Sequence, residues 1–391
     1  MASIPYGYLL PALLVLWCQG AVWLPRTWAR VRPPFGLPFT VNELPGFALV
    51  IFLGPTWLAF STGDIDSIAE WCAFGLTIVA SLGLIGQIYF GLQASSTIHR
   101  ALDRGFGKTD WRTSIPPRMA LQLGRSFTPI ALLGPFLIRR HDVRRIANIP
   151  YGNAGLRNLL DIYQPRSLPT SAPVLVHLHG GAFVRGKKNR EGLPLLYRLA
   201  SKGFLGISAN YRLRPSATFP DQLIDIKKVI AWIREYGQEY GADPSQIFIA
   251  GSSAGANLAA LAALTPNDPS LQPGFEEVDT AVDAAICLYG YYGSVDLHAG
   301  VPSSPLAYTN PEAPPFFLAH GDRDTIVPVE EARHFQAHLR HASSQPVIYA
   351  ELPGAEHVFD LFHSIRNEAI LHGIEAFTAW VRANNGNNFP R

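Results

Sequence analysis

Residues 251–255 read Gly-Ser-Ser-Ala-Gly and lie between an apolar, β-prone run and a stretch rich in alanine and leucine. A Gly-x-Ser-x-Gly pattern between a strand and a helix is typical of a sharp turn that exposes a serine hydroxyl for nucleophilic attack. The pattern therefore predicts that Ser253 is the nucleophile of an acyl-transfer reaction. An ordinary glycine–serine turn could have the same five letters, so the prediction depends on the other groups that this chemistry needs.

A second segment could supply hydrogen-bond donors for the negative charge of a tetrahedral intermediate. A β-prone run ends at residue 178 and is followed by His179, Gly180 and Gly181. Glycines let the bare backbone approach a reacting atom, so we expect the amides of Gly180, Gly181 and Ala254 to form an oxyanion hole. We interpret His179, at the start of this loop, as a structural histidine and not as the general base.

A base and an acid to orient it should follow the serine in the chain. Asp322 and Asp324 both lie in a polar loop after an apolar strand. We favour Asp324, because the residues after it begin the next helix, and we assign Asp322 a structural role in the loop. His357 lies just past another apolar strand. We predict that His357 removes the Ser253 proton and that Asp324 holds the imidazole in the correct tautomer.

Taken together, these motifs resemble the α/β-hydrolase superfamily, and most closely its hormone-sensitive-lipase-like and acylglycerol-esterase-like carboxylesterases. Membrane-bound bacterial esterases and prenylcysteine methylesterases are particularly similar. The resemblance covers residues 146–383 and rests on segments 179–181, 210–213, 243–247, 253–258 and 320–324. Two positions depart from the pattern of hormone-sensitive-lipase relatives. Ser252 stands where they usually have aspartate, and Ala182 replaces the third glycine of their oxyanion loop.

The resemblance implies a mostly parallel sheet flanked by helices, and the alternation of apolar runs along the chain agrees with it. We expect strands over residues 158–163, 174–179, 205–211, 246–250, 284–289, 316–320 and 347–352. We expect helices over residues 193–202, 221–240, 254–264, 329–342 and 363–383.

Apolar residues are concentrated in the first hundred positions. Three runs, 7–24, 44–61 and 69–93, are each about the length that a hydrocarbon core of about 30 Å requires. The second is the shortest and could instead be a buried helix. We therefore expect a transmembrane region over residues 1–95, a basic linker or cap over 96–145, and an α/β-hydrolase catalytic domain over 146–391.

Charged residues near the apolar runs predict the orientation of the chain. Arginines follow the first and third runs, whereas only Asp64 and Asp66 separate the second from the third. The positive-inside rule then predicts an N-terminus outside and a catalytic domain on the cytoplasmic face. Residues 128–138 form a short apolar run, which we interpret as an interfacial or cap element or as a linker.

The composition excludes several other classes of function. A net charge of +2 over 391 residues argues against a nucleic-acid partner. The three cysteines have no spacing typical of a metal site or a disulfide. We expect no metal and no cofactor.

The leading hypothesis is a membrane-anchored serine carboxylesterase or lipase that acts on a small hydrophobic ester beside a lipid bilayer. A prenylcysteine methylesterase or a formamidase-like amidase would use the same site. A hydrolase-fold binding protein without catalysis is a further alternative, although such relatives usually lack the serine or the histidine.

Overall fold

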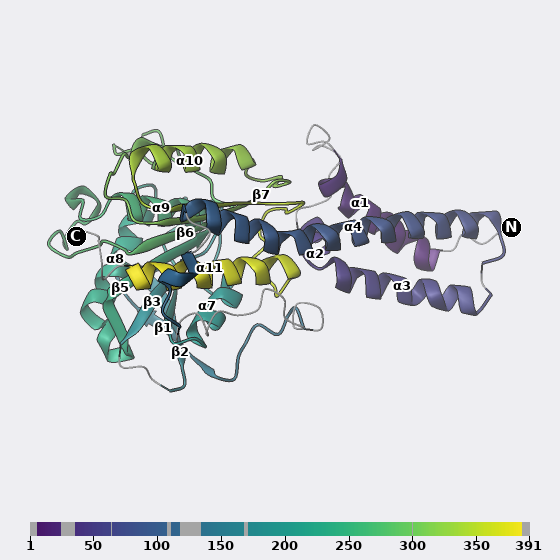
Figure 1. The fold of residues 1–391 in the computed structure, drawn as a ribbon, viewed down its shortest axis with the longest axis horizontal. Coiled ribbons are helices and arrows are strands. Elements are labelled where there is room, and N and C mark those ends of the chain that lie inside the picture. Colours follow the sequence, from purple (N-terminus) through teal and green to yellow (C-terminus); the bar gives the residue numbers. More distant parts are fainter. Residues whose placement is uncertain are drawn as a thin grey trace.

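A computed structural model describes residues 6–24, 36–63, 65–107, 111–117, 134–167, 171–298 and 300–384. Figure 1 shows an α/β body from which a group of N-terminal helices extends to one side. The long helix α4 (Ile68–Gly105) belongs to both parts, because its first half lies in the extension and its second half lies against the body.

The described part of the body contains one sheet of eight strands in the order β1-β2-β4-β3-β5-β6-β7-β8. The pairings from β4 through β8 are parallel, whereas β1 and β2 are antiparallel to their neighbours. The strands are β1 (Val143–Pro150), β2 (Leu159–Pro165), β3 (Ala172–Leu178), β4 (Leu205–Ala209), β5 (Ala242–Ser252), β6 (Ala284–Leu288), β7 (Phe316–Gly321) and β8 (Val347–Leu352). The predicted α/β-hydrolase fold is confirmed.

Helices cover both faces of the sheet, as its buried parallel strands require. One face packs against α8 (Asp221–Tyr236), α9 (Ala254–Leu264) and α10 (Val329–Ala342). The other face packs against α7 (Leu193–Ala200), α11 (Ile365–Asn384) and the second half of α4. Along β3, side chains alternate between these layers, with Val174 and Val176 in the first and Leu175 in the second.

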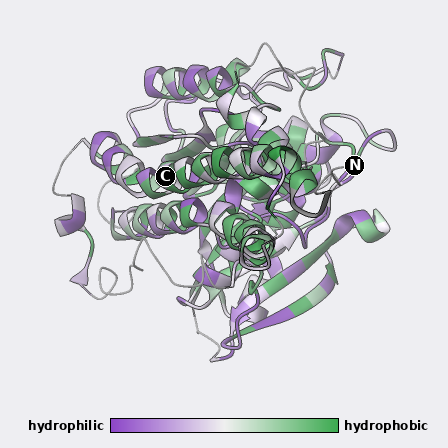
Figure 2. Ribbon diagram, turned by 90° about the vertical axis from the view of Figure 1, so that its right-hand side faces the viewer, coloured by the Kyte–Doolittle hydropathy of each residue, from purple (hydrophilic) through white to green (hydrophobic). Residues whose placement is uncertain are grey.

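The N-terminal extension consists of α1 (Tyr6–Trp23), α2 (Gly36–Glu43), α3 (Pro45–Ser61) and the first half of α4. Among the described residues, α4 alone is long and apolar enough to cross a bilayer by itself. The pair α2 and α3 meets the same criterion only together, and it is bent by 94°. Figure 2 views this extension nearly end-on, and the helices nearest the viewer are largely hydrophobic in colour.

The structure differs from the sequence prediction in the region assigned to a linker. Helix α4 continues past residue 93 to Gly105, and Ala94, Ile98 and Leu102 are buried in the core of the body. These side chains form one stripe at helical spacing, which the polar residues between them, among them His99 and Arg100, conceal in the sequence. Strand β1 begins in this region at Val143, and its charged Arg144 and Arg145 and its terminal Pro150 gave little strand signal.

The predicted interfacial element at residues 128–138 lies mostly outside the described residues. Of its described part, Phe136 packs edge-on against Phe47 of α3 and Phe362 of the body, with ring centroids 5.5 and 5.3 Å away. This segment therefore lies where the extension meets the body.

Candidate active site

The turn at Ser253 has the geometry that the glycine spacing predicts. Ser253 joins β5 to α9 with φ 55° and ψ −117°, a conformation that costs free energy for a residue with a side chain. A Cβ atom at Gly251 would lie 2.1 Å from the Gly255 carbonyl oxygen, and one at Gly255 would lie 2.2 Å from the Leu178 carbonyl oxygen. Both glycines are thus required by close backbone approach.

The three residues predicted to act together are in contact. Ser253 Oγ lies 3.0 Å from His357 Nε2, and His357 Nδ1 lies 2.6 Å from Asp324 Oδ2. The serine follows β5, the aspartate follows β7 and the histidine follows β8. Because these strands are parallel, their carboxyl ends bring together residues that are more than 100 positions apart in the chain.

The surroundings of Asp324 determine which histidine nitrogen carries the proton. Its second oxygen, Oδ1, accepts hydrogen bonds from the amides of Ile326 and Val327 at 2.9 and 2.8 Å. Burial alone would raise the pKa of Asp324, but the charges and hydrogen bonds of His357 and His320 outweigh it and hold the pKa below its usual range. An ionised carboxylate only accepts hydrogen bonds, so His357 Nδ1 donates and Nε2 is left to accept from Ser253.

The other loop aspartate, Asp322, has a different position. Its Oδ1 accepts a hydrogen bond of 2.8 Å from the backbone amide of Gly354, in the loop that leads to His357. Asp322 therefore links the loops after β7 and β8, in agreement with the structural role expected from the sequence.

Two further titratable residues, His320 and Glu356, lie beside Asp324 and His357, and neither was predicted from the sequence. His320 Nε2 lies 3.2 Å from Asp324 Oδ2, four residues along the chain. Glu356 accepts hydrogen bonds from the amide and hydroxyl of Thr325 at 2.6 and 2.5 Å. Burial raises the pKa of Glu356 to about 7. The four-residue spacing between His320 and Asp324 could have indicated the role of His320.

The glycine loop lies directly beside the serine. A Cβ atom at Gly180 would be 3.1 Å from Ser253 Cβ, and Gly181 has φ +118°. Ala254 begins α9, where backbone amides point out of the helix. Burial raises the pKa of the nearby Glu191 carboxyl to about 7.

His179 is held away from a catalytic role by its own contacts. Its Nδ1 donates a 2.7 Å hydrogen bond to the Gly180 carbonyl, and its ring stacks on Tyr211 at 4.3 Å. Burial lowers the pKa of His179 to about 4. The structural hydrogen bond expected at this position is present.

A buried polar network lies behind the serine. Ser252 Oγ donates to Asp360 Oδ2 at 2.6 Å and lies 3.0 Å from His177 Nε2, while the Tyr289 hydroxyl donates to the other Asp360 oxygen. Burial raises the pKa of Asp360. Asp360 follows His357 by three residues, so the network ties the histidine loop to the turn that carries Ser253. Sequence reasoning missed Asp360, which lies in no recognisable motif.

Residues 289–292 follow β6 beside the proposed base and contain three tyrosines. Tyr289 and Tyr292 are buried, and the Tyr289 ring lies 4.5 Å from the His357 ring in an edge-on arrangement. These two tyrosines therefore pack the loop. Within the described ranges no group of three or more histidine, cysteine, aspartate or glutamate side chains could hold a metal ion.

Several known proteins are similar to this chain in sequence. Residues 160–302 match the BD-FAE family model. The probable carboxylic ester hydrolase LipM of Mycobacterium tuberculosis is 39% identical over 335 residues, covering 78% of this chain and 77% of LipM. A probable isoprenylcysteine α-carbonyl methylesterase of Oryza sativa subsp. japonica is 32% identical over 152 residues, covering 39% of this chain and 36% of that protein.

Among solved structures, esterase 2 of Thermogutta terrifontis, phosphoramylated by tabun, superposes with a TM-score of 0.52 at 24% identity. The match covers 61% of this chain and 92% of that one, and it shows a shared fold.

Proposed function

We propose a specific reaction for this chain, which belongs to the hormone-sensitive-lipase-like carboxylesterases of the α/β-hydrolase superfamily. The chain is a carboxylic ester hydrolase by this relationship, and we assign the chemistry to Ser253, His357 and Asp324. The observation that carries the assignment is the unbroken line of contacts from the serine hydroxyl to the buried carboxylate.

In the first half of the reaction, Ser253 Oγ attacks the ester carbonyl carbon while His357 Nε2 takes its proton. The imidazolium that forms is stabilised by Asp324. His357 then returns the proton to the leaving alkoxide, so that an alcohol departs and an acyl-serine remains. In the second half, water gives its proton to His357, attacks the acyl carbon and releases the acid with the regenerated serine.

The negative charge of each tetrahedral intermediate requires donors beside Ser253. We assign this role to the amides of Gly180 and Gly181 on the glycine loop and of Ala254 at the start of α9. Loss of one such donor typically costs about a hundredfold or more in rate.

Membrane anchoring through the N-terminal helices is part of the proposal. Exposed apolar side chains of α4 continue as far as Tyr89 and Leu92. At this level, Phe90 packs against Gly354, beyond the carboxyl end of β8 and three residues before His357. If the apolar half of α4 crosses a bilayer, the catalytic edge of the sheet lies at the membrane surface. This placement suits a hydrophobic ester that partitions into lipid, and the loop charges favour the cytoplasmic side.

The test is covalent labelling of the full-length protein in detergent with a fluorescent fluorophosphonate. We expect the wild type and the exposed-serine control Ser270→Ala to be labelled and Ser253→Ala to remain unlabelled. Equal labelling of Ser253→Ala would overturn the assignment.

A prenylcysteine methylesterase is the second candidate, and the similarity to the rice protein named above favours it. Both activities would use the same three residues, so the acyl and alcohol groups must separate them. A panel of p-nitrophenyl esters of increasing chain length, a prenylcysteine methyl ester and an N-formyl anilide would rank ester, methylester and amide turnover. Binding of these compounds without turnover would instead favour a catalytically silent binding protein.

A further inference from the structure

The loop that carries His357 is in contact with the N-terminal helices. Asn42, near the end of α2, donates a 3.1 Å hydrogen bond from Nδ2 to the Gly354 carbonyl oxygen. Gly354 has φ +61°, and a Cβ atom there would lie 2.6 Å from the Phe90 ring of α4. The segment three residues before the proposed base is thus held between two N-terminal helices.

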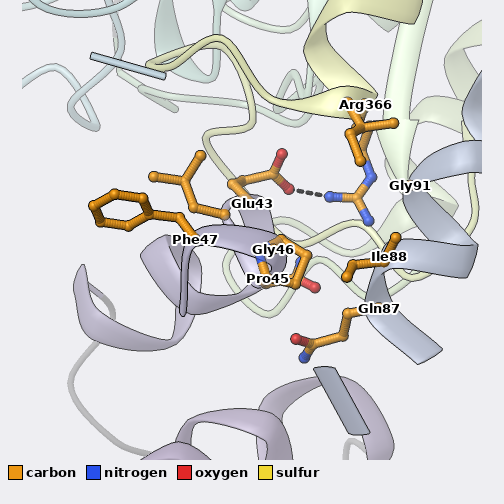
Figure 3. Close-up of a pocket in the computed structure, with 11 residues that line it drawn as sticks. Glu43, Pro45, Gly46, Phe47, Gln87, Ile88, Gly91 and Arg366 are labelled. Carbon is orange, nitrogen blue, oxygen red and sulfur yellow. Dashed lines mark hydrogen bonds and ion pairs between the residues drawn. The ribbon is translucent and has the colours of Figure 1, made fainter. Parts of the chain in front are cut away.

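A buried ion pair reinforces this contact. Glu43, the last residue of α2, pairs with Arg366 at the start of α11, and Figure 3 shows the two side chains facing each other. Arg366 Nη2 also donates to the Pro353 carbonyl oxygen at 3.4 Å. The second Glu43 oxygen accepts a 3.0 Å hydrogen bond from Ser364 Oγ. Glu43 therefore reaches both ends of the loop, directly at Ser364 and through Arg366 at Pro353.

Stability alone is a poor explanation for this arrangement. A buried ion pair loses hydration free energy that its mutual attraction only partly recovers, so apolar residues of similar size often serve stability as well or better. What the pair and Asn42 provide is directional hydrogen bonding to particular backbone atoms. Catalysis is sensitive to such positioning, since a displacement of about 1 Å can cost about a hundredfold in rate.

We propose that Asn42, Glu43 and Arg366 are positioning residues that hold the Pro353–Ser364 loop so that His357 reaches Ser253. The N-terminal helices are then part of the catalytic scaffold as well as an anchor. This inference rests on the proposed esterase function and concerns the same site.

The test compares Asn42→Leu with a matched control, Gln87→Leu, in the full-length protein. Gln87 lies on α4 and lines the same small pocket as Asn42, Glu43 and Arg366. It is 1% exposed, and neither atom of its amide has a hydrogen-bond partner. Both substitutions remove a buried amide of one region, but only Asn42→Leu removes a bond to the histidine loop.

We expect Asn42→Leu to lower kcat on a p-nitrophenyl ester, and the rate of fluorophosphonate labelling, by about tenfold with little change in KM. Rates are expressed per active site, titrated with the same reagent. Gln87→Leu should match the wild type in kcat, KM and labelling rate.

A second variant guards against misfolding of the first. Glu43→Gln combined with Arg366→Met removes the ion pair without leaving a lone buried charge, and it should show the same loss of kcat. Two results would overturn the proposal: unchanged kcat per titrated site in both variants, or an equal loss in Gln87→Leu. A wild type that neither hydrolyses esters nor is labelled at Ser253 would refute the proposed function itself, and this inference with it.

Discussion

The body and the N-terminal extension place their apolar side chains in opposite ways. All seven residues of β3 are buried within the sheet, whereas on α3 Val50 and Trp57 are 73% and 72% exposed. Burial of apolar surface contributes about 25 cal/mol per Å² to folding, and the body gains this free energy by packing its apolar side chains against one another. The extension does not, and contiguous exposed apolar surface indicates contact with lipid or with another protein.

Helix α4 shows this contrast within a single element. Its first half exposes Ile78, Val79 and Leu82, whereas its second half buries Ala94 and Ile98 in the core of the body. The polar contacts of Asn42 and Glu43 lie close to this change of environment. The two parts therefore suit different surroundings. They contact each other at the loop that carries His357.

The largest expected effect is the loss of ester hydrolysis when Asp324, in the body, is changed. Asp324→Asn should lower kcat by about 10⁴, because an amide no longer holds His357 in the tautomer that accepts the serine proton. Steady-state hydrolysis of a p-nitrophenyl ester measures it. Asp322→Asn is the matched control, since its amide oxygen can still accept from Gly354, and its loss should stay below about tenfold. Comparable losses in the two variants would contradict the assigned acid.

Buried and exposed leucines of the two parts should differ in their contribution to the free energy of unfolding. Leu175→Ala empties a fully buried site on β3 and should cost about 2–5 kcal/mol of unfolding free energy. Leu58→Ala on α3 removes a side chain that is 62% exposed and should cost less than about 1 kcal/mol. Denaturant titration in detergent, followed by the activity of the body, measures both. A large cost at Leu58 would show that α3 is packed inside a water-soluble assembly.

An arginine introduced on the exposed apolar face of the extension tests whether that face contacts lipid. Leu82→Arg places a cation on the exposed apolar face of α4 and should cost about 2.5–3.5 kcal/mol of membrane insertion. Leu156→Arg makes the same change at a site in the body that is 78% exposed. The fraction that resists alkaline carbonate extraction from membranes should fall only in Leu82→Arg. An unchanged fraction in both would argue against lipid contact at this face.

The last prediction concerns the pH dependence of stability. Glu356 has an ordinary pKa near 4.5 when exposed, and burial raises it to about 7 in the folded protein. Between these values the folded state binds a proton that the unfolded state has lost, so this residue makes stability fall as pH rises through the window. Glu356→Gln should abolish that part of the fall. If the carboxyl titrated normally, the difference in melting temperature between the two proteins would stay constant from pH 4 to pH 8.

Much of the body could be predicted because its signals are local. The run before Ser253, the glycines around it and the alanine-rich stretch after it specify strand, turn and helix within about 20 residues. The same reasoning placed Asp324 and His357 in loops after strands, and the structure brings both to the serine. In contrast, α4 beyond residue 93 was missed because polar residues, among them Arg100, interrupt its buried stripe. Strand β1 was missed because an edge strand needs little apolar character.

The sequence by itself determined which residues could do the chemistry and the α/β order that brings them to one edge, because both depend on local propensity and on the spacing of apolar residues. Only the tertiary structure decided what supports them. The contacts of Asp360 with Ser252 and of Asn42 with Gly354 join positions whose proximity depends on how distant segments fold over one another. A hydrogen bond between distant residues leaves no periodic trace in the chain, so no reading of one sequence could have found the last of these.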